Sequence, residues 1–155
     1  MINTKSLIIS TLLGVSSLSL LPALAQAIPL AQAKCSFSGQ SSIAPEPFKQ
    51  LSALSVTVSN GTSPRRAIVL LAADICVEDG AEVRILYSVD GRAPAVFGPT
   101  NLANHQQFCE TRSTLAVIAL PAGNHTIRAF WAVSGAPGKR ADFVQGCVTA
   151  ESRTQ

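Results

Sequence analysis

Residues 115–133, LAVIALPAGNHTIRAFWAV, form two apolar segments joined by a turn, and this stretch decides the fold class. Before the turn, Leu115, Val117 and Ala119 share one face of a strand that we expect over 108–120. The PAGN sequence at 121–124 supplies the turn. After it, alternate residues of 125–133 share an apolar face: Ile127, Ala129, Trp131 and Val133. This period of two predicts neighbouring β-strands and not a helix.

The same pattern recurs on both sides of this stretch. Residues 54–59 alternate and then meet Asn60-Gly61, and residues 83–89 alternate and then meet Asp90-Gly91, which is a tight-hairpin signal. Residues 67–77 are almost continuously apolar, so we expect that strand to be buried on both faces for part of its length. A last strand fits 143–150, and 101–107 has room for one helical turn. Six or seven short strands predict an all-β, antiparallel, jelly-roll-like β-sandwich.

Composition narrows the class of protein. The chain has 155 residues, of which 47% are hydrophobic and only 14% are charged, with a formal net charge of +3. A low charged fraction with this much apolar material argues against disorder and coiled coil. No long run of like charges is present, so we expect no nucleic-acid partner.

The first residues have the layout of a secretory signal peptide. Lys5 precedes an apolar run over 7–21, and Pro22 is followed by small residues at 23–27. The run is about 15 residues, shorter than the ~20 that span a bilayer, so we expect removal of 1–27, with cleavage somewhere within 25–33. The remaining chain would have no stable membrane span and would be secreted or periplasmic. We expect 28–53 to form an N-terminal segment with the first strand, and 54–155 to form the sandwich.

Four cysteines lie in the part that would be exported, and three pairings are open from the sequence alone. We favour Cys35 with Cys147 and Cys76 with Cys109, because the terminal strands of a closed sandwich often become neighbours. Each bridge would stabilise the fold by about 2 to 4 kcal/mol. No C-x-x-C motif is present, which argues against a zinc knuckle or a thioredoxin-type redox site.

The segment from Leu120 to Trp131, followed by Val133-Ser134-Gly135, resembles the LPAG-x-HT hairpin of small jelly-roll modules in secreted bacterial and phage-tail proteins. The segments 54–58, 67–75 and 84–91 fall in the order that such modules show, whereas the four cysteines depart from their pattern. The resemblance implies jelly-roll architecture and homo-oligomers, often trimers. It implies little about chemistry, because function on shared folds resides in individual sites.

Residues that carry chemistry are few. His105 stands in a polar segment and is expected to be a solvated loop residue, whereas His125 is expected to bond the hairpin backbone. No G-x-S-x-G or H-E-x-x-H signature is present, so we expect no catalytic residue and no cofactor. Four acidic residues raise the possibility of calcium: Asp74, Glu78, Asp79 and Glu82. Their spacing lacks the calcium-loop pattern, so a solvated turn is favoured and no metal is expected.

Several other residues bear on ligand binding. Tyr87 and Trp131 lie in apolar stripes and are expected in the core, which leaves Phe97 as the best exposed ring. The basic pairs at 65–66 and 139–140 could meet an anionic surface or a glycan. Asn60 and Asn124 satisfy the glycosylation rule, but both belong to turn signals, and the turn interpretation is favoured.

Two functional hypotheses remain. The first is a non-catalytic binding or structural module of the cell exterior, with a cell-envelope component or glycan as its partner. The second is a small secreted enzyme or enzyme inhibitor, with a site built from the loops at 93–107 and 134–142. We favour the first, because no active-site constellation is visible in the sequence.

Overall fold

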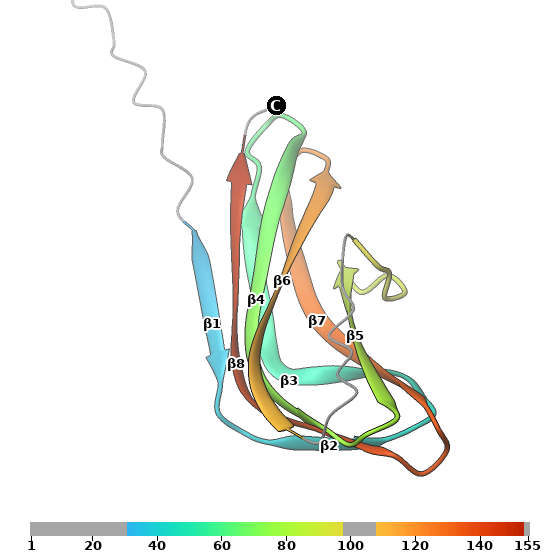
Figure 1. Cartoon of the computed structure of the whole chain (residues 1–155). Helices are drawn as coiled ribbons and strands as arrows, with labels where there is room; N and C mark the ends of the chain where they lie inside the picture. Colours follow the sequence, from blue (N-terminus) through green and yellow to red (C-terminus); the bar gives the residue numbers. More distant parts are fainter. Residues whose placement is uncertain (1–30, 98–107, 154–155) are drawn as a thin grey trace, which may run out of the picture.

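The chain folds into two antiparallel sheets that face one another (Figure 1). The computed structural model describes residues 31–97 and 108–153. The signal peptide expected over 1–27, the helical turn expected at 101–107, and His105 lie outside the described residues. Eight strands are present in the described part: β1 (Gln32–Ser36), β2 (Gln40–Ile43), β3 (Glu46–Ser59), β4 (Arg65–Val77), β5 (Ala81–Val89), β6 (Phe108–Leu120), β7 (Asn124–Gly135) and β8 (Arg140–Arg153).

The strand order is that of a jelly roll. One sheet, here called sheet A, has the order β1-β8-β4-β6, with β2 also paired to β8; the other, sheet B, has the order β3-β7-β5. From β3 to β8, each strand lies in the opposite sheet to the strand before it, so the chain winds back and forth between the layers. The expected all-β antiparallel sandwich is confirmed. Its strands begin before Leu54, because β1, β2 and the first half of β3 already pair with β8 and β7.

Large apolar side chains fill the space between the sheets. Trp131 and Tyr87 are fully buried, as the sequence predicts. Trp131 of β7 meets Phe143 of β8 edge to face, with ring centroids 6.5 Å apart, so this contact joins the two layers. Tyr87 also joins them, because its hydroxyl lies 3.1 Å from Thr114 Oγ1 of β6. Burial raises the pKa of the Tyr87 hydroxyl.

Two disulfides lie within sheet A and join residues that stand directly opposite one another. Cys35 of β1 is bonded to Cys147 of β8, and Cys76 of β4 is bonded to Cys109 of β6. These are the pairs favoured from the sequence. The described residues contain no free cysteine. Two disulfides are typical of proteins from an oxidising compartment.

Turn chemistry at the ends of the strands follows the sequence signals. Asp90 and Gly91 both have positive φ, of 52° and 76°, and the Arg92 amide donates to the Val89 carbonyl at 3.0 Å. That is the geometry a two-residue hairpin turn requires. The chain then returns beside β5, where Ala95 forms an isolated bridge with Tyr87.

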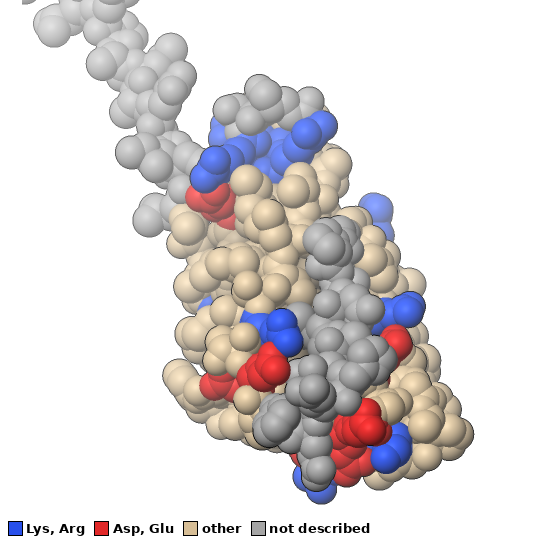
Figure 2. All heavy atoms as spheres, viewed as in Figure 1, with Lys and Arg blue, Asp and Glu red and all other residues tan. Residues whose placement is uncertain are grey.

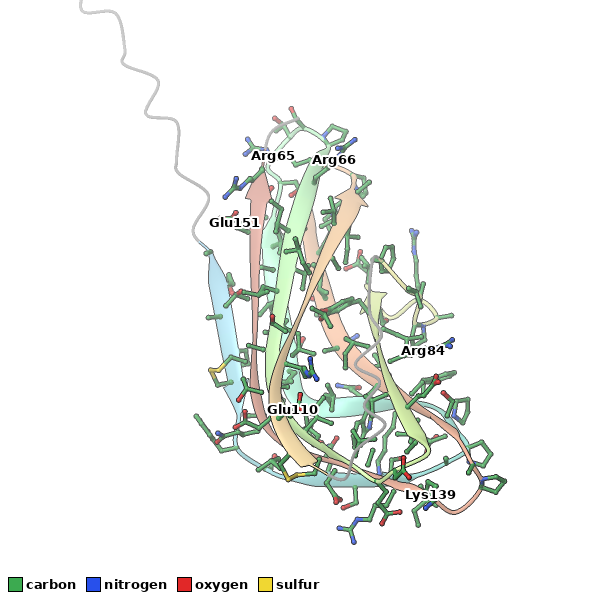
Figure 3. All side chains as sticks on the ribbon, in the orientation of Figure 1. Arg65, Arg66, Arg84, Glu110, Lys139 and Glu151 are labelled. Carbon is green, nitrogen blue, oxygen red and sulfur yellow. A yellow bond between two sulfur atoms is a disulfide. The ribbon has the colours of Figure 1, made fainter. Side chains whose placement is uncertain are left out.

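The outward side of sheet A differs from expectation. Alternate residues of β4 from Ala67 to Val77 are buried, but Leu70 between them is 41% exposed, so β4 is not buried on both faces. On β6 the inward residues are Ala116, Ile118 and Leu120, and the stripe 115, 117, 119 faces outward. Both faces of this strand are apolar, so alternation alone could not assign its inward side. In Figure 2 a wide surface without charged groups lies below the basic group that contains Arg65 and Arg66, which are labelled in Figure 3.

Candidate functional site

A pocket lies where β2, the start of β3 and the start of β8 meet. It has a volume of about 430 Å³ and is lined by Ser41, Ser42, Ile43, Glu46, Lys49 and Arg140. This volume falls within the range of small-molecule sites. The turn between β7 and β8 is fixed beside it, because the Ala44 amide donates to the Lys139 carbonyl at 2.8 Å and the Gly138 amide donates to the Ala44 carbonyl at 3.0 Å.

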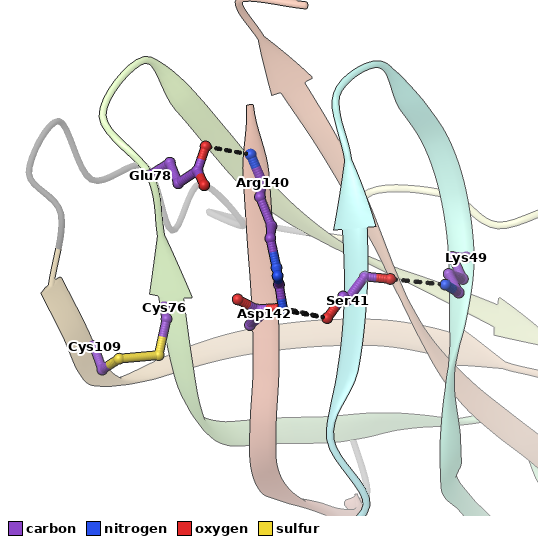
Figure 4. A network of polar contacts seen from close by, with 7 residues as sticks. All are labelled: Ser41, Lys49, Cys76, Glu78, Cys109, Arg140 and Asp142. Atoms are coloured by element: carbon purple, nitrogen blue, oxygen red, sulfur yellow. Dashed lines mark hydrogen bonds and ion pairs between the residues drawn. A yellow bond between two sulfur atoms is a disulfide. The ribbon is translucent and has the colours of Figure 1, made fainter. Parts of the chain in front are cut away.

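Arg140 is held in place from several directions (Figure 4). Its backbone amide donates to Glu78 Oε2 at 3.0 Å. Its side-chain Nε donates to Asp142 Oδ1 at 2.8 Å, and its Nη2 donates to Ser41 Oγ at 3.0 Å. Ser41 Oγ in turn donates to Asp142. The guanidinium is therefore oriented before any ligand arrives, while its side chain remains about half exposed, at 54%.

Lys49 and Glu46 are the other two charged residues that line the pocket. Lys49 Nζ donates to the Ser41 carbonyl at 2.9 Å, which uses one of the three donors of an ammonium group. Glu46 Oε2 accepts from Ser42 Oγ at 3.4 Å. Lys49 and Arg140 are balanced by Glu46 on the lining and by Asp142, which is paired with Arg140, so these four groups carry no net charge. Ile43, which is 60% exposed, adds an apolar surface next to these polar groups.

His125 lies at the opposite end of β3 from the pocket, because it pairs with Val58 whereas Lys49 pairs with Trp131. Its Nδ1 lies 2.8 Å from Asp90 Oδ2, and its Nε2 lies 3.1 Å from the Pro121 carbonyl. The hydrogen bond to Asp90 raises the pKa of His125, and the same bond, together with the Thr126 amide, lowers the pKa of Asp90. Both ring nitrogens are engaged and the imidazole is buried, so the arrangement holds two turns together.

Three of the four acidic residues considered for calcium have other partners in the structure. Asp74 accepts from Thr111 Oγ1 at 2.5 Å and from Gln145 Nε2 at 2.6 Å, and these bonds lower its pKa. Glu78 accepts from the Arg140 amide, and Glu82 lies 3.8 Å from Arg84. Within 31–97 and 108–153, no group of three or more His, Cys, Asp or Glu residues is placed to hold a metal.

The expectation that Phe97 is an exposed ring is wrong. Phe97 packs against the core, because the bridge between Ala95 and Tyr87 holds this segment beside β5. Among the side chains that the structure describes, the exposed rings are Phe37 and Phe48 instead. The loop expected at 134–142 is also shorter, since Ser134 and Gly135 belong to β7 and the strand β8 begins at Arg140. The other candidate loop, at 93–107, lies largely outside the described residues.

Of the residues singled out from the sequence, only Arg140 of the second basic pair lines the pocket. Ser41, Ser42, Glu46 and Lys49 were missed, because nothing in 28–53 indicates that two strands there meet the start of β8. Asn60 is buried and its side chain bonds the β6–β7 turn, in agreement with the turn interpretation. None of the described residues forms a helix with the length and hydropathy needed to cross a membrane.

No family model and no curated protein matches this chain. Among solved structures, it is similar to a chain of the infectious bursal disease virus Gx strain, with a TM-score of 0.44 and 13% identity over 94% of this chain and 40% of the viral chain. It is also similar to Eiger TNF from S. frugiperda, with a TM-score of 0.39 and 10% identity over 82% of this chain and 94% of the other. This chain thus spans less than half the length of the viral chain. The fold assignment rests on the strand order described above and not on these likenesses.

Proposed function

We propose that this chain is an exported, non-catalytic binding module, and that its pocket between β2, β3 and β8 holds a glycan of the cell exterior. The observation that carries the proposal is the preoriented guanidinium of Arg140, fixed by Ser41 and Asp142 in a pocket of about 430 Å³. A group that is already oriented loses little conformational entropy on binding.

The lining has the chemistry that a sugar ring requires. Adjacent sugar hydroxyls both donate and accept hydrogen bonds, and the pocket offers donors on Lys49 and Arg140 and a carboxylate acceptor on Glu46. The exposed side chain of Ile43 can cover the apolar C–H face of the ring. Because Asp142 offsets the charge of Arg140, recognition would rest on these hydrogen bonds and on the apolar contact, and not on net charge.

Export is part of the same proposal. The signal-peptide layout of 1–27 and the two disulfides both fit a secreted or periplasmic protein. At the cell exterior, a disulfide-bonded β-sandwich with an open pocket is suited to hold an envelope polysaccharide.

A catalytic role is less favoured on the geometry of the histidine. The pair of His125 and Asp90 has the separation of a base and its orienting carboxylate. However, His125 Nε2 already faces the Pro121 carbonyl, and that is the atom a nucleophile would need. We therefore assign His125 a structural role and keep a small secreted enzyme or inhibitor as the alternative that the experiment below tests.

The test is binding of the disulfide-intact protein to an array of immobilised acidic and neutral oligosaccharides. We expect binding to at least one oligosaccharide of the array, and a loss of at least about tenfold in affinity for Lys49→Ala and Arg140→Ala. Arg84→Ala is the matched control, because Arg84 is an exposed arginine with one ion pair on β5. Equal binding by all three variants, or hydrolysis of the bound glycan that disappears in His125→Ala, would overturn the proposal.

A further inference from the structure

On the outward side of sheet A, residues that stand opposite one another on neighbouring strands form rows across the sheet. One row holds Leu70 with Thr149 on β8 and Leu115 on β6. The row on one side holds Ile68, Val117 and Glu151, and the row on the other holds Ala72, Ser113 and the disulfide of Cys35 and Cys147. Ala33 of β1 stands next to Thr149. We call this set the outer face of sheet A.

This face is more apolar than a solvent-facing sheet surface usually is. Leu115 and Val117 are 50% and 51% exposed, and Leu70 is 41% exposed. The outward side of an antiparallel sheet is normally polar, whereas here neighbouring apolar residues on β4 and β6 form a continuous area. Each of these three residues therefore keeps about half of its surface exposed among the described residues.

The two ends of the outer face carry opposite charge. At one end, Arg66 pairs in register with Arg153, and Glu151 in the next row offsets one of these two positive charges. At the other end stands Asp74, whose carboxylate accepts from Thr111 and Gln145. The apolar rows thus lie between one net positive and one net negative end, and Figure 2 shows the basic end next to the uncharged surface.

We propose that two copies of this chain pack their outer faces of sheet A against each other. The two-fold axis would lie in the interface, perpendicular to the strands, so that Arg66 of one copy approaches Asp74 of the other. A two-fold interface uses the same surface on both copies, so it requires a self-complementary surface. Apolar rows with opposite charges at their two ends meet that requirement, and this complementarity favours a second copy over an unrelated partner.

The size of the face is sufficient for a weak dimer. Three strands spaced by about 4.8 Å and followed from Arg66 to Asp74 at about 3.4 Å per residue, with β1 beside about half of that length, give an area on the order of 500 Å² per copy. Two copies would then bury roughly 1,000 Å² in total, which is the size of a weak, transient interface. The pocket residues Ser41 and Arg140 lie further along sheet A than Asp74, outside the apolar rows.

The first test is analytical ultracentrifugation of the disulfide-intact protein over a concentration series. We expect a reversible dimer that is weakened at least tenfold by Leu115→Glu. Val96→Glu is the matched control, because Val96 is exposed to a similar extent but lies beyond β5, and we expect its dimer affinity to stay within about twofold of wild type. The unfolding midpoints of both variants would show that the fold is intact.

The second test is a charge swap. Arg66→Asp and Asp74→Arg should each weaken the dimer, because each places like charges together across the interface, and the double variant should restore it. A wild-type protein that stays monomeric at about millimolar concentration, a dimer unaffected by Leu115→Glu, a trimer, or a double variant no better than either single one would overturn the proposal. A chain that stays monomeric by itself and whose outer face is covered only by a different protein would also overturn the proposal.

Discussion

Asn60 provides the sharpest test of how the two sheets are joined. It follows β3 of sheet B, yet its side chain reaches sheet A. Its Nδ2 donates to the carbonyls of Leu120 at 3.2 Å and Pro121 at 2.7 Å, and its Oδ1 accepts from Ser152 Oγ at 2.7 Å. Asn60 and Ser152 are both buried, so no bulk water replaces these bonds. One amide group therefore connects the ends of three strands.

The expected cost of Asn60→Ala is worked from these bonds. Three hydrogen bonds at about 1 kcal/mol each give a loss of about 3 kcal/mol in the free energy of unfolding. Ser152→Ala removes one bond and should cost about 1 to 2 kcal/mol, because it leaves the Asn60 oxygen without its donor. The double variant should cost less than the sum, since both changes remove the same bond, with a coupling energy of about 1 kcal/mol.

The assay is equilibrium unfolding in urea without reductant, followed by the fluorescence of Trp131. This residue is the only tryptophan and is fully buried, so its emission reports exposure of the core. Asn124→Ala is the control, because Asn124 is an exposed asparagine at the start of β7 and should change stability by no more than about 0.5 kcal/mol. A cost below about 1 kcal/mol for Asn60→Ala, or additive effects with Ser152→Ala, would refute the reasoning.

Three further predictions concern ionisation, covalent links and backbone geometry. Because the pKa of His125 is raised and that of Asp90 is lowered, their bond should stabilise the fold most between about pH 4 and pH 6.5. The contribution of this bond should fall as the pH rises through the folded-state pKa of His125 or drops through that of Asp90. Thermal unfolding of wild type and Asp90→Asn at pH 5 and pH 9 measures this contribution. An equal difference in melting temperature between the two proteins at both pH values would contradict the prediction. Replacing Cys35 and Cys147 by Ser should cost about 4.8 kcal/mol, against about 3.8 kcal/mol for Cys76 and Cys109, because the sequence separations are 112 and 33 residues; urea midpoints in the reverse order would argue against loop entropy as the cause. Gly135→Ala should lower the melting temperature strongly, since Gly135 has a φ of 114° and an added methyl group would overlap the Gly80 carbonyl. Gly61→Ala should cost only about 1 kcal/mol, because no atom lies within 4 Å of the added methyl group there. Similar losses for the two variants would show that the overlap at Gly135 is relieved.

The strands and turns were predictable because their signals are local. Alternation over 83–89 and the Asp90-Gly91 turn both lie within a few residues, and the structure has them at those positions. The disulfide pairs followed from a topological expectation about neighbouring terminal strands. The side of β6 that faces inward was not predictable, because residues 115 to 120 are apolar on both faces. Only the sheet that covers Ile118 decides between them.

The pocket could not be predicted for a different reason. Its residues come from the neighbouring strands β2 and β3 and from β8, which follows β2 by about 100 residues, and Ser41 meets Asp142 only through the register of β2 with β8. Serines and a lysine in an N-terminal segment have no pattern that distinguishes them from solvated surface. The contact between Asp90 and His125 could not be predicted either, because the two residues belong to different turns.

The position of β8 has a consequence for how the chain is made. β8 follows the other described strands in the chain and lies between β1 and β4, and β1 has no other neighbour in sheet A. β4 can pair with β6 before β8 is present, whereas β1 and β2 pair within sheet A only with β8 and must wait for Arg140–Arg153. A chain truncated just before Arg140 would therefore lack the strand that attaches its N-terminal segment to the rest of the sheet.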